Sequence, residues 1–115
     1  MKKDVSINDY IVAGAWLRLS KTVLATTIVF VSKILTQREI ARLITAHRNL
    51  SEVSNIADIK VHNKYPEREG VKDIFYGAVD VESRSEIDSK VRRAILDAID
   101  AIYSTALKPE IKEEQ

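Results

Sequence analysis

The sequence predicts an α+β fold, a single domain with elements in the order helix, strand, helix, short helix, strand, strand, helix (α-β-α-α-β-β-α). Three observations lead to this class. Residues 22–31 form an uncharged segment dominated by β-branched and aromatic side chains, which favour strands. Residues 73–81 follow a loop punctuated by Pro66 and Gly70 and alternate as a strand does. Residues 85–107 repeat apolar side chains at helical spacing.

The composition is that of one ordered domain. The chain has 115 residues, a formal net charge of +1 and no cysteine. We expect a domain over residues 1–108, followed by an acidic flexible tail over residues 109–115. The lack of cysteine excludes disulfides and thiolate metal sites and leads us to expect a cytoplasmic protein. Because the net charge is small, nucleic-acid binding would require a local basic patch.

The first 35 residues combine a basic start with an apolar stretch, as export signals and membrane spans do. Asp4 and Asp9 interrupt the basic start, and no small-x-small cleavage site follows. Arg18 and Lys21 would lie near the middle of a span, where each costs about 2.5–3.5 kcal/mol. We therefore expect no membrane partner and predict a helix that begins at Ser6, with Asp9 completing a weak capping box.

That first helix is apolar on most of its sides. Such a helix is either enclosed in its own domain or buried against another subunit. Gly14 would let a second element approach it closely. The following segment, residues 22–31, is apolar on both faces of the predicted strand and therefore needs helices above and below it. If this segment instead continued the first helix, the fold would be the alternative, an all-α helical bundle.

The middle of the chain predicts two helices and a strand. Thr36 and Glu39 form a capping box ahead of a helix over residues 37–46. Residues 47–49 have turn character, and Ser51 can cap a short helix over residues 51–57. A strand over residues 57–62, the loop 63–70 and the strand 73–81 then form a hairpin. The last helix, residues 85–107, ends before Pro109.

Two architectures share this order of elements. In a winged helix, residues 37–46 and 51–57 form the helix-turn-helix, and the loop 63–70 is the tip of the wing. In a ferredoxin-like sandwich, the three predicted strands form one antiparallel sheet. The apolar strand 22–31 favours the sandwich, whereas the capping box and the turn before Ser51 favour the winged helix.

Charge placement points to double-stranded DNA as a partner. Residues 33–72 hold eight Lys or Arg against five Asp or Glu, whereas the rest of the chain holds ten against twelve. We predict a non-enzymatic regulatory protein of transcription of the winged-helix type, with cations on phosphate and polar side chains toward base edges. An ordinary solvated charged surface explains the same pattern. The predicted DNA-binding residues are Arg38, Arg48, Ser51, Ser54, Asn55, Lys64, Arg68 and Lys72.

The alternative is a self-associating assembly or interaction module without a nucleic-acid role. The first and last helices offer more apolar surface than a sheet of short strands needs, and this surface predicts a homo-oligomer. The two readings are compatible, because many DNA-binding domains dimerise through flanking helices. The predicted interface residues are Ile7, Tyr10, Ile11, Trp16, Leu17, Val91, Ile95 and Ile102.

No pattern in the sequence indicates an enzyme. Catalysis needs a base beside a nucleophile or convergent carboxylates, and neither is suggested by the spacing of the candidate residues. His47 and His62 have no acidic residue at metal-motif spacing on a helix. We therefore predict no catalytic residue, no metal site and no cofactor.

Overall fold

The protein is an assembly of three long helices in a computed structural model that describes residues 4–77 and 83–114. These residues contain no strand, so the predicted α+β class is wrong in both its winged-helix and its ferredoxin-like form. The all-α alternative is the fold that forms. Its elements are α1 (Ile7–Val31), α2 (Gln37–Lys64), the 3-10 helix η1 (Val71–Asp73) and α3 (Glu86–Glu114).

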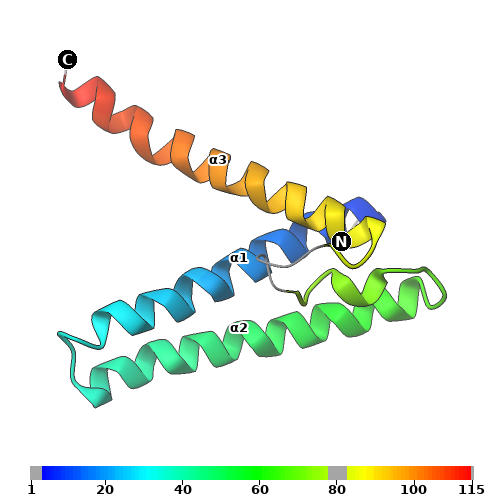
Figure 1. Cartoon of the computed structure of the whole chain (residues 1–115), viewed down its shortest axis with the longest axis horizontal. Coiled ribbons are helices and arrows are strands. Elements are labelled where there is room, and N and C mark those ends of the chain that lie inside the picture. Colours follow the sequence, from blue (N-terminus) through cyan, green and yellow to red (C-terminus); the bar gives the residue numbers. More distant parts are fainter. Residues whose placement is uncertain (1–3, 78–82, 115) are drawn as a thin grey trace.

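The helices α1 and α2 form an antiparallel hairpin, and α3 diverges from it (Figure 1). Residues 32–36 join α1 to α2 at the closed end of the hairpin. At the open end, η1 packs against α2, and α3 begins beside the first half of α1. The free end of α3 points away from the hairpin, so the molecule is packed at one end and open at the other.

The predicted strand over residues 22–31 is the second half of α1. No glycine or proline separates it from the first half, and each β-branched residue costs a helix no more than about 0.7 kcal/mol. Leu24, Ile28 and Val31 are half-buried at spacings of four and three residues. The sequence does not reveal this helical stripe, because every neighbour of these residues is apolar or small. The apolar residues of the segment therefore fit the two-residue period of a strand as well as the period of a helix.

The predicted helices 37–46 and 51–57 and the predicted strand 57–62 are all parts of α2. The predicted turn at residues 47–49 lacks glycine and proline, so nothing interrupts the helix. Spacings of three and four residues alternate along the side of α2 that is at least half-buried, as in a coiled coil. The residues on this side are Ile40, Leu43, His47, Leu50, Ser54, Ala57 and Val61.

Both predicted capping boxes are confirmed. In α1 the Ser6 hydroxyl accepts from the amide of Asp9, whose carboxylate accepts from the amide of Ser6. Thr36 and Glu39 make the same pair of bonds at α2, at 3.2 and 2.9 Å. These bonds lower the pKa of Asp9 and of Glu39, since each carboxylate accepts them only when ionised.

The predicted hairpin around residues 63–70 does not form. The segment ends α2 at Lys64 and turns through Gly70, which has a left-handed φ of 84°. Residues 71–73 form η1, and residues 74–77 continue without regular structure, so the predicted strand is wrong there; residues 78–81 lie outside the described residues. Ile74 and Phe75 are adjacent and both fully buried, whereas a strand would place them on opposite faces.

The last helix begins where it was predicted and extends further than predicted. The Ser85 hydroxyl accepts from the amide of Asp88 at 3.0 Å, and α3 starts at Glu86. It continues through Pro109 to Glu114, beyond the expected end at residue 107. The division into a domain over residues 1–108 and a flexible tail over residues 109–115 stays a prediction.

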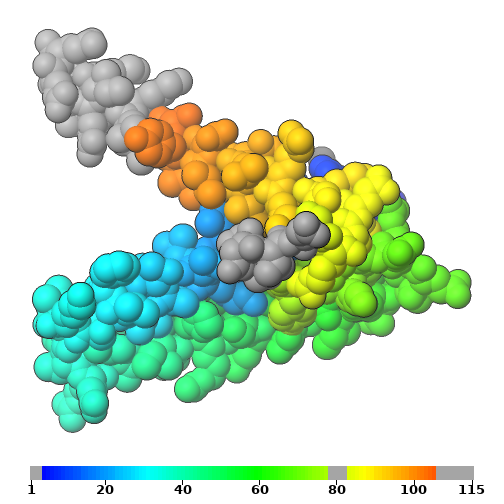
Figure 2. Space-filling view, viewed as in Figure 1, coloured from blue at the N-terminus to red at the C-terminus, as the bar shows by residue number. Residues whose placement is uncertain are grey.

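The hydrophobic core lies at the open end of the hairpin. Gly14 confirms the predicted close approach, because a Cβ there would lie 2.4 Å from the carbonyl oxygen of Ile74. No residue between Leu19 and Val53 is fully buried. Two arms therefore extend from the core, the hairpin arm (residues 22–50) and the α3 arm (residues 99–105), as Figure 2 shows. The core consists of Ile11, Ala15, Val61, Val71, Ile74, Phe75, Ile87, Val91 and Ile95.

Candidate functional site

The candidate site is the apolar cleft between α1 and α3, which opens as the two helices diverge (Figure 2). Its inner part has a volume of about 460 Å³ and is lined by both helices. Towards the opening, Trp16 and Val23 of α1 lie near Ile102 of α3. The inner lining consists of Leu19, Thr22, Arg92, Ile95, Leu96 and Ile99.

The apolar stripe of α3 extends beyond the part of the helix that its own chain covers. Val91, Ile95 and Ala98 are at most 5% exposed, whereas Ile102, the next residue of the stripe, is 48% exposed. Ile99, which lies beside this stripe, is 43% exposed. An amphipathic helix normally ends its apolar stripe where its burial ends. The α3 arm thus presents an apolar face that the described residues of its own chain leave about half exposed.

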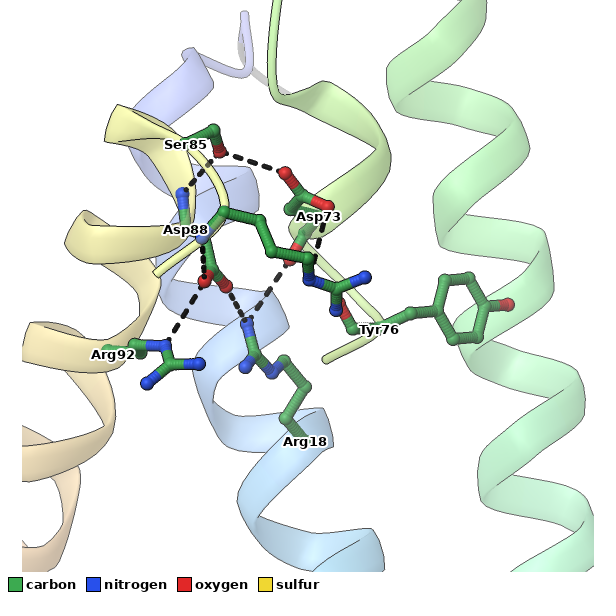
Figure 3. Close-up of polar contacts among 7 residues, drawn as sticks. Arg18, Asp73, Tyr76, Ser85, Asp88 and Arg92 are labelled. Atoms are coloured by element: carbon green, nitrogen blue, oxygen red, sulfur yellow. Dashed lines mark hydrogen bonds and ion pairs between the residues drawn. The ribbon is translucent and has the colours of Figure 1, made fainter. Parts of the chain in front are cut away.

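A buried ion pair marks the closed end of the cleft. Arg18 of α1 lies 3.1 Å from the carboxylate of Asp88 of α3, with both side chains at most 3% exposed. The same guanidinium donates to the carbonyl of Asp73 in η1 at 3.2 Å (Figure 3). Three elements that are distant in sequence therefore meet at one arginine, and this contact sets the position from which α1 and α3 diverge.

Polar neighbours satisfy the carboxylate of Asp88 from several sides. The backbone amide of Arg84 donates to it at 3.0 Å, and Arg92 donates from one helical turn away at 3.1 Å. Burial raises the pKa of Asp88, but these hydrogen bonds and the charges of Arg18 and Arg92 outweigh it and hold the pKa below 3.8. The carboxylate is therefore ionised at neutral pH and compensates the buried cation.

Lys21 of α1 and Tyr76 lie next to each other beside α2, outside the residues that line the cleft. The Lys21 ammonium lies 5.0 Å from the centre of the Tyr76 ring, and the Tyr76 hydroxyl donates to the side-chain oxygen of Asn55. Burial and the charge of Arg18 lower the pKa of Lys21, and burial and the charge of Asp58 raise that of Tyr76. This contact joins α1, the segment after η1 and α2 without entering the cleft.

The predicted interface residues separate into three groups. Ile11, Val91 and Ile95 are buried in the chain's own core. Ile7, Tyr10 and Leu17 are partly buried against it. Only Trp16 and Ile102 lie exposed in the cleft. The sequence reasoning missed three further exposed residues of the cleft, and the helical spacing along 16–23 and 95–102 would have identified them: Val23, Leu96 and Ile99.

The predicted DNA-binding residues are distributed along the molecule and do not converge. Arg38 and Lys64 lie at opposite ends of α2, about 39 Å apart at 1.5 Å per residue. Ser54 is fully buried and donates to the carbonyl of Leu50 at 2.9 Å. Asn55 accepts from Tyr76, and Lys64 donates to the carbonyl of Val5. Ser51 is half-buried. The remaining predicted residues are exposed cations, namely Arg38, Arg48, Arg68 and Lys72.

The histidines do not form a metal site with their neighbours in the described part of the chain. His62 lies 3.3 Å from the carboxylate of Asp58, one helical turn earlier. Within residues 4–77 and 83–114, no three His, Cys, Asp or Glu side chains come together as metal ligands. The cleft itself is lined mainly by aliphatic and aromatic groups, with Thr22 and Arg92 among its polar members, and this lining can bind apolar surface.

Comparison of the chain with known protein families, curated proteins and solved structures finds no match.

Proposed function

We propose that this protein is a non-enzymatic self-association module and that the cleft between α1 and α3 receives the α3 arm of a second copy. The observation that supports this most strongly is the stripe of α3, which remains apolar at Ile99 and Ile102 after its own chain no longer covers it. Large exposed apolar surfaces on soluble domains commonly mark interaction sites. The opposite wall offers Trp16 and Val23, which are 40% and 55% exposed.

A second copy fits this cleft because each copy supplies both an open cleft and a free α3 arm. A two-fold axis would place each arm in the other cleft and make the two contacts identical. One pair of opposite charges is available, since Lys21 of α1 adjoins the cleft residue Thr22, whereas Arg18 is buried and already paired with Asp88. Asp97 and Asp100 border the apolar stripe of α3 and would approach Lys21 of the second copy.

The expected affinity follows from the apolar area. A large apolar side chain contributes about 1.5–3 kcal/mol when fully buried. Six partly exposed side chains in each of two copies therefore supply on the order of 10 kcal/mol. This gain is comparable with an association cost of about 4–15 kcal/mol. We expect a reversible dimer whose population depends on concentration. The six are Trp16, Val23, Leu96, Ile99, Ile102 and Tyr103.

The test is the oligomeric state of matched variants, measured by analytical ultracentrifugation over a wide concentration range. Ile102→Glu places a charge in the cleft and should leave the protein monomeric at concentrations where the unmodified chain dimerises. Ile59→Glu changes the same residue type at an exposed site of α2, outside the residues that line the cleft, and should dimerise normally. A monomeric unmodified chain at every concentration, or equal behaviour of the two variants, would contradict the proposal.

DNA binding stays a prediction. Its winged-helix scaffold is absent from the described residues, but exposed cations on α2 can still contact phosphate without one. An electrophoretic shift assay on random duplex DNA at low ionic strength addresses it directly. Absence of a shift there would remove the physical basis of this prediction.

A further inference from the structure

The closed end of the α1–α2 hairpin presents apolar side chains to solvent, at a distance from the core and from the cleft. Ile34 is 81% exposed, and Phe30 and Val29 are 66% and 62% exposed. Ile34 lies in the connection between the helices, and the other two lie in the last turn of α1. We call the hairpin tip the set Val29, Phe30, Lys33, Ile34, Arg38 and Arg42.

Nothing in the described chain covers this tip. The fully buried residues of α1 end at Arg18, and those of α2 begin at Ser54. Only a half-buried seam holds the two helices together between these positions. The apolar side chains of the tip therefore contribute little to the stability of the fold. Packing within the chain does not explain why these residues are apolar.

The charge around the tip is mainly positive. Residues 22–32 have no charged side chain, and Lys33, Arg38 and Arg42 follow, with Glu39 as the one acid among them. Glu39 is occupied in the capping box with Thr36. The Lys33 ammonium lies 6.0 Å from the centre of the Phe30 ring, so charge and apolar surface are adjacent.

We propose that the hairpin tip inserts into the surface of an anionic lipid bilayer. Exposed aromatic and aliphatic side chains next to lysine and arginine match the two parts of a lipid interface, the acyl boundary and the anionic headgroups. Duplex DNA would use the cations, but its outer phosphate surface would give Phe30 and Ile34 no apolar contact. This inference is independent of the association through the cleft.

The geometry limits the contact to the interface. By length and composition α1 is apolar enough to cross a membrane, yet Arg18 is paired inside the fold with Asp88. Interfacial elements enter about 5–10 Å into the headgroup and acyl boundary. Lys21 lies about 14 Å along the helix from Phe30, so it stays outside that depth. The expectation of no membrane partner came from the cost of Arg18 and Lys21 in a span, and shallow insertion avoids this cost.

The experiment measures co-flotation of the full chain with vesicles of phosphatidylcholine, alone or mixed with phosphatidylserine. The unmodified chain should bind the mixed vesicles and lose binding in high salt. The double variant Phe30→Ser and Ile34→Ser leaves the charge unchanged. Its affinity for the mixed vesicles should be lower than that of the unmodified chain by a factor of about ten or more. The control Ile59→Ser, also exposed but distant from the tip, should bind like the unmodified chain.

The outcomes separate this proposal from its competitors. Absence of binding to the mixed vesicles, or equal binding by the double variant, overturns it. The membrane proposal is also overturned if the unmodified chain does not bind vesicles and the double variant no longer self-associates. That result would assign the tip to a protein interface. Undiminished vesicle binding by Ile102→Glu supports it and shows that the tip acts without the cleft, even if the dimer proposal fails.

Discussion

Arg18 is a cation that the fold encloses almost completely, at 3% exposure. Its Nη1 atom reaches Asp88 and the Asp73 carbonyl, whereas its Nε and Nη2 atoms are buried without a hydrogen-bond partner in the described structure. A buried ion pair of this kind often adds little net stability, because both charges lose their hydration. Its effect is to make one arrangement of α1, η1 and α3 much better than any other.

Replacing Asp88 with asparagine should therefore be costly. The change leaves the Arg18 charge buried and uncompensated, and we expect the free energy of unfolding to fall by about 3–5 kcal/mol. Urea unfolding followed by circular dichroism measures it. The double variant Arg18→Met and Asp88→Asn should recover part of the loss, because it removes the buried charge altogether. A double variant less stable than Asp88→Asn would contradict this account.

The same pair defines a pH dependence. Asp88 has a pKa below its ordinary 3.8 in the folded protein, so its contribution is present above that value and is lost as the pH falls through the lower folded pKa. The stability difference between the unmodified chain and Asp88→Asn should therefore shrink below about pH 4. Comparing the two chains cancels the shared effects of Asp9 and Glu39, whose pKa values are also lowered.

At the scale of elements, the close approach of the segment after η1 to α1 depends on the missing side chain of Gly14. A Cβ there would lie 2.6 Å from the Cγ2 atom of Ile74, the residue after η1, as well as 2.4 Å from its carbonyl oxygen. Because backbone cannot move as easily as the end of a side chain, the contact fixes how closely Ile74 approaches α1. This contact between elements supports the side of the core that contains Phe75.

Gly14→Ala tests that contact. Overpacking should lower the free energy of unfolding by about 1–3 kcal/mol. Helix propensity alone predicts the opposite, a gain of about 1 kcal/mol in the middle of a helix. Thermal and urea unfolding distinguish the two signs. Ala13→Ser, at the exposed neighbouring position, is the control and should stay within about 0.5 kcal/mol. A stabilised Gly14→Ala protein would mean that Ile74 does not lie against α1 as described.

At the scale of the molecule, stability is concentrated at one end. The buried residues of α1, α2 and α3 all gather around η1, and the two arms project from them. Local opening is cheapest where few apolar contacts exist. An isolated copy should therefore have a stable core and two arms that open more readily.

Hydrogen exchange should show this gradient in dilute protein. Amides over residues 54–61 and 87–95 should exchange slowly, and those over 24–50 should exchange sooner. Raising the concentration should slow exchange over residues 99–105 if the α3 arm docks into a second copy. Uniform protection along the whole hairpin would contradict the one-ended distribution of the core.

Particular residues show what was predictable. Ser6 and Thr36 predicted the starts of α1 and α2 correctly, because a capping box is a local set of bonds. The strand predicted over residues 22–31 is wrong, because the β-branched side chains of this segment are compatible with both a strand and a long helix.

In the candidate site, the sequence predicts Trp16 and Ile102. It does not predict Val23, because Val23 lies in the segment that was assigned to a strand.

The sequence by itself determined the starts of the three helices and the single apolar stripe of the last helix, since these depend on neighbouring residues and on residue types. Only the tertiary structure decided that residues 22–31 are helical, that Arg18 pairs with Asp88, and which apolar side chains stay uncovered. The physical reason is that burial is a property of pairs of surfaces. An apolar stripe in the sequence indicates that some other surface must cover it. Only the packed chain shows which part of the stripe is covered by the protein's own residues.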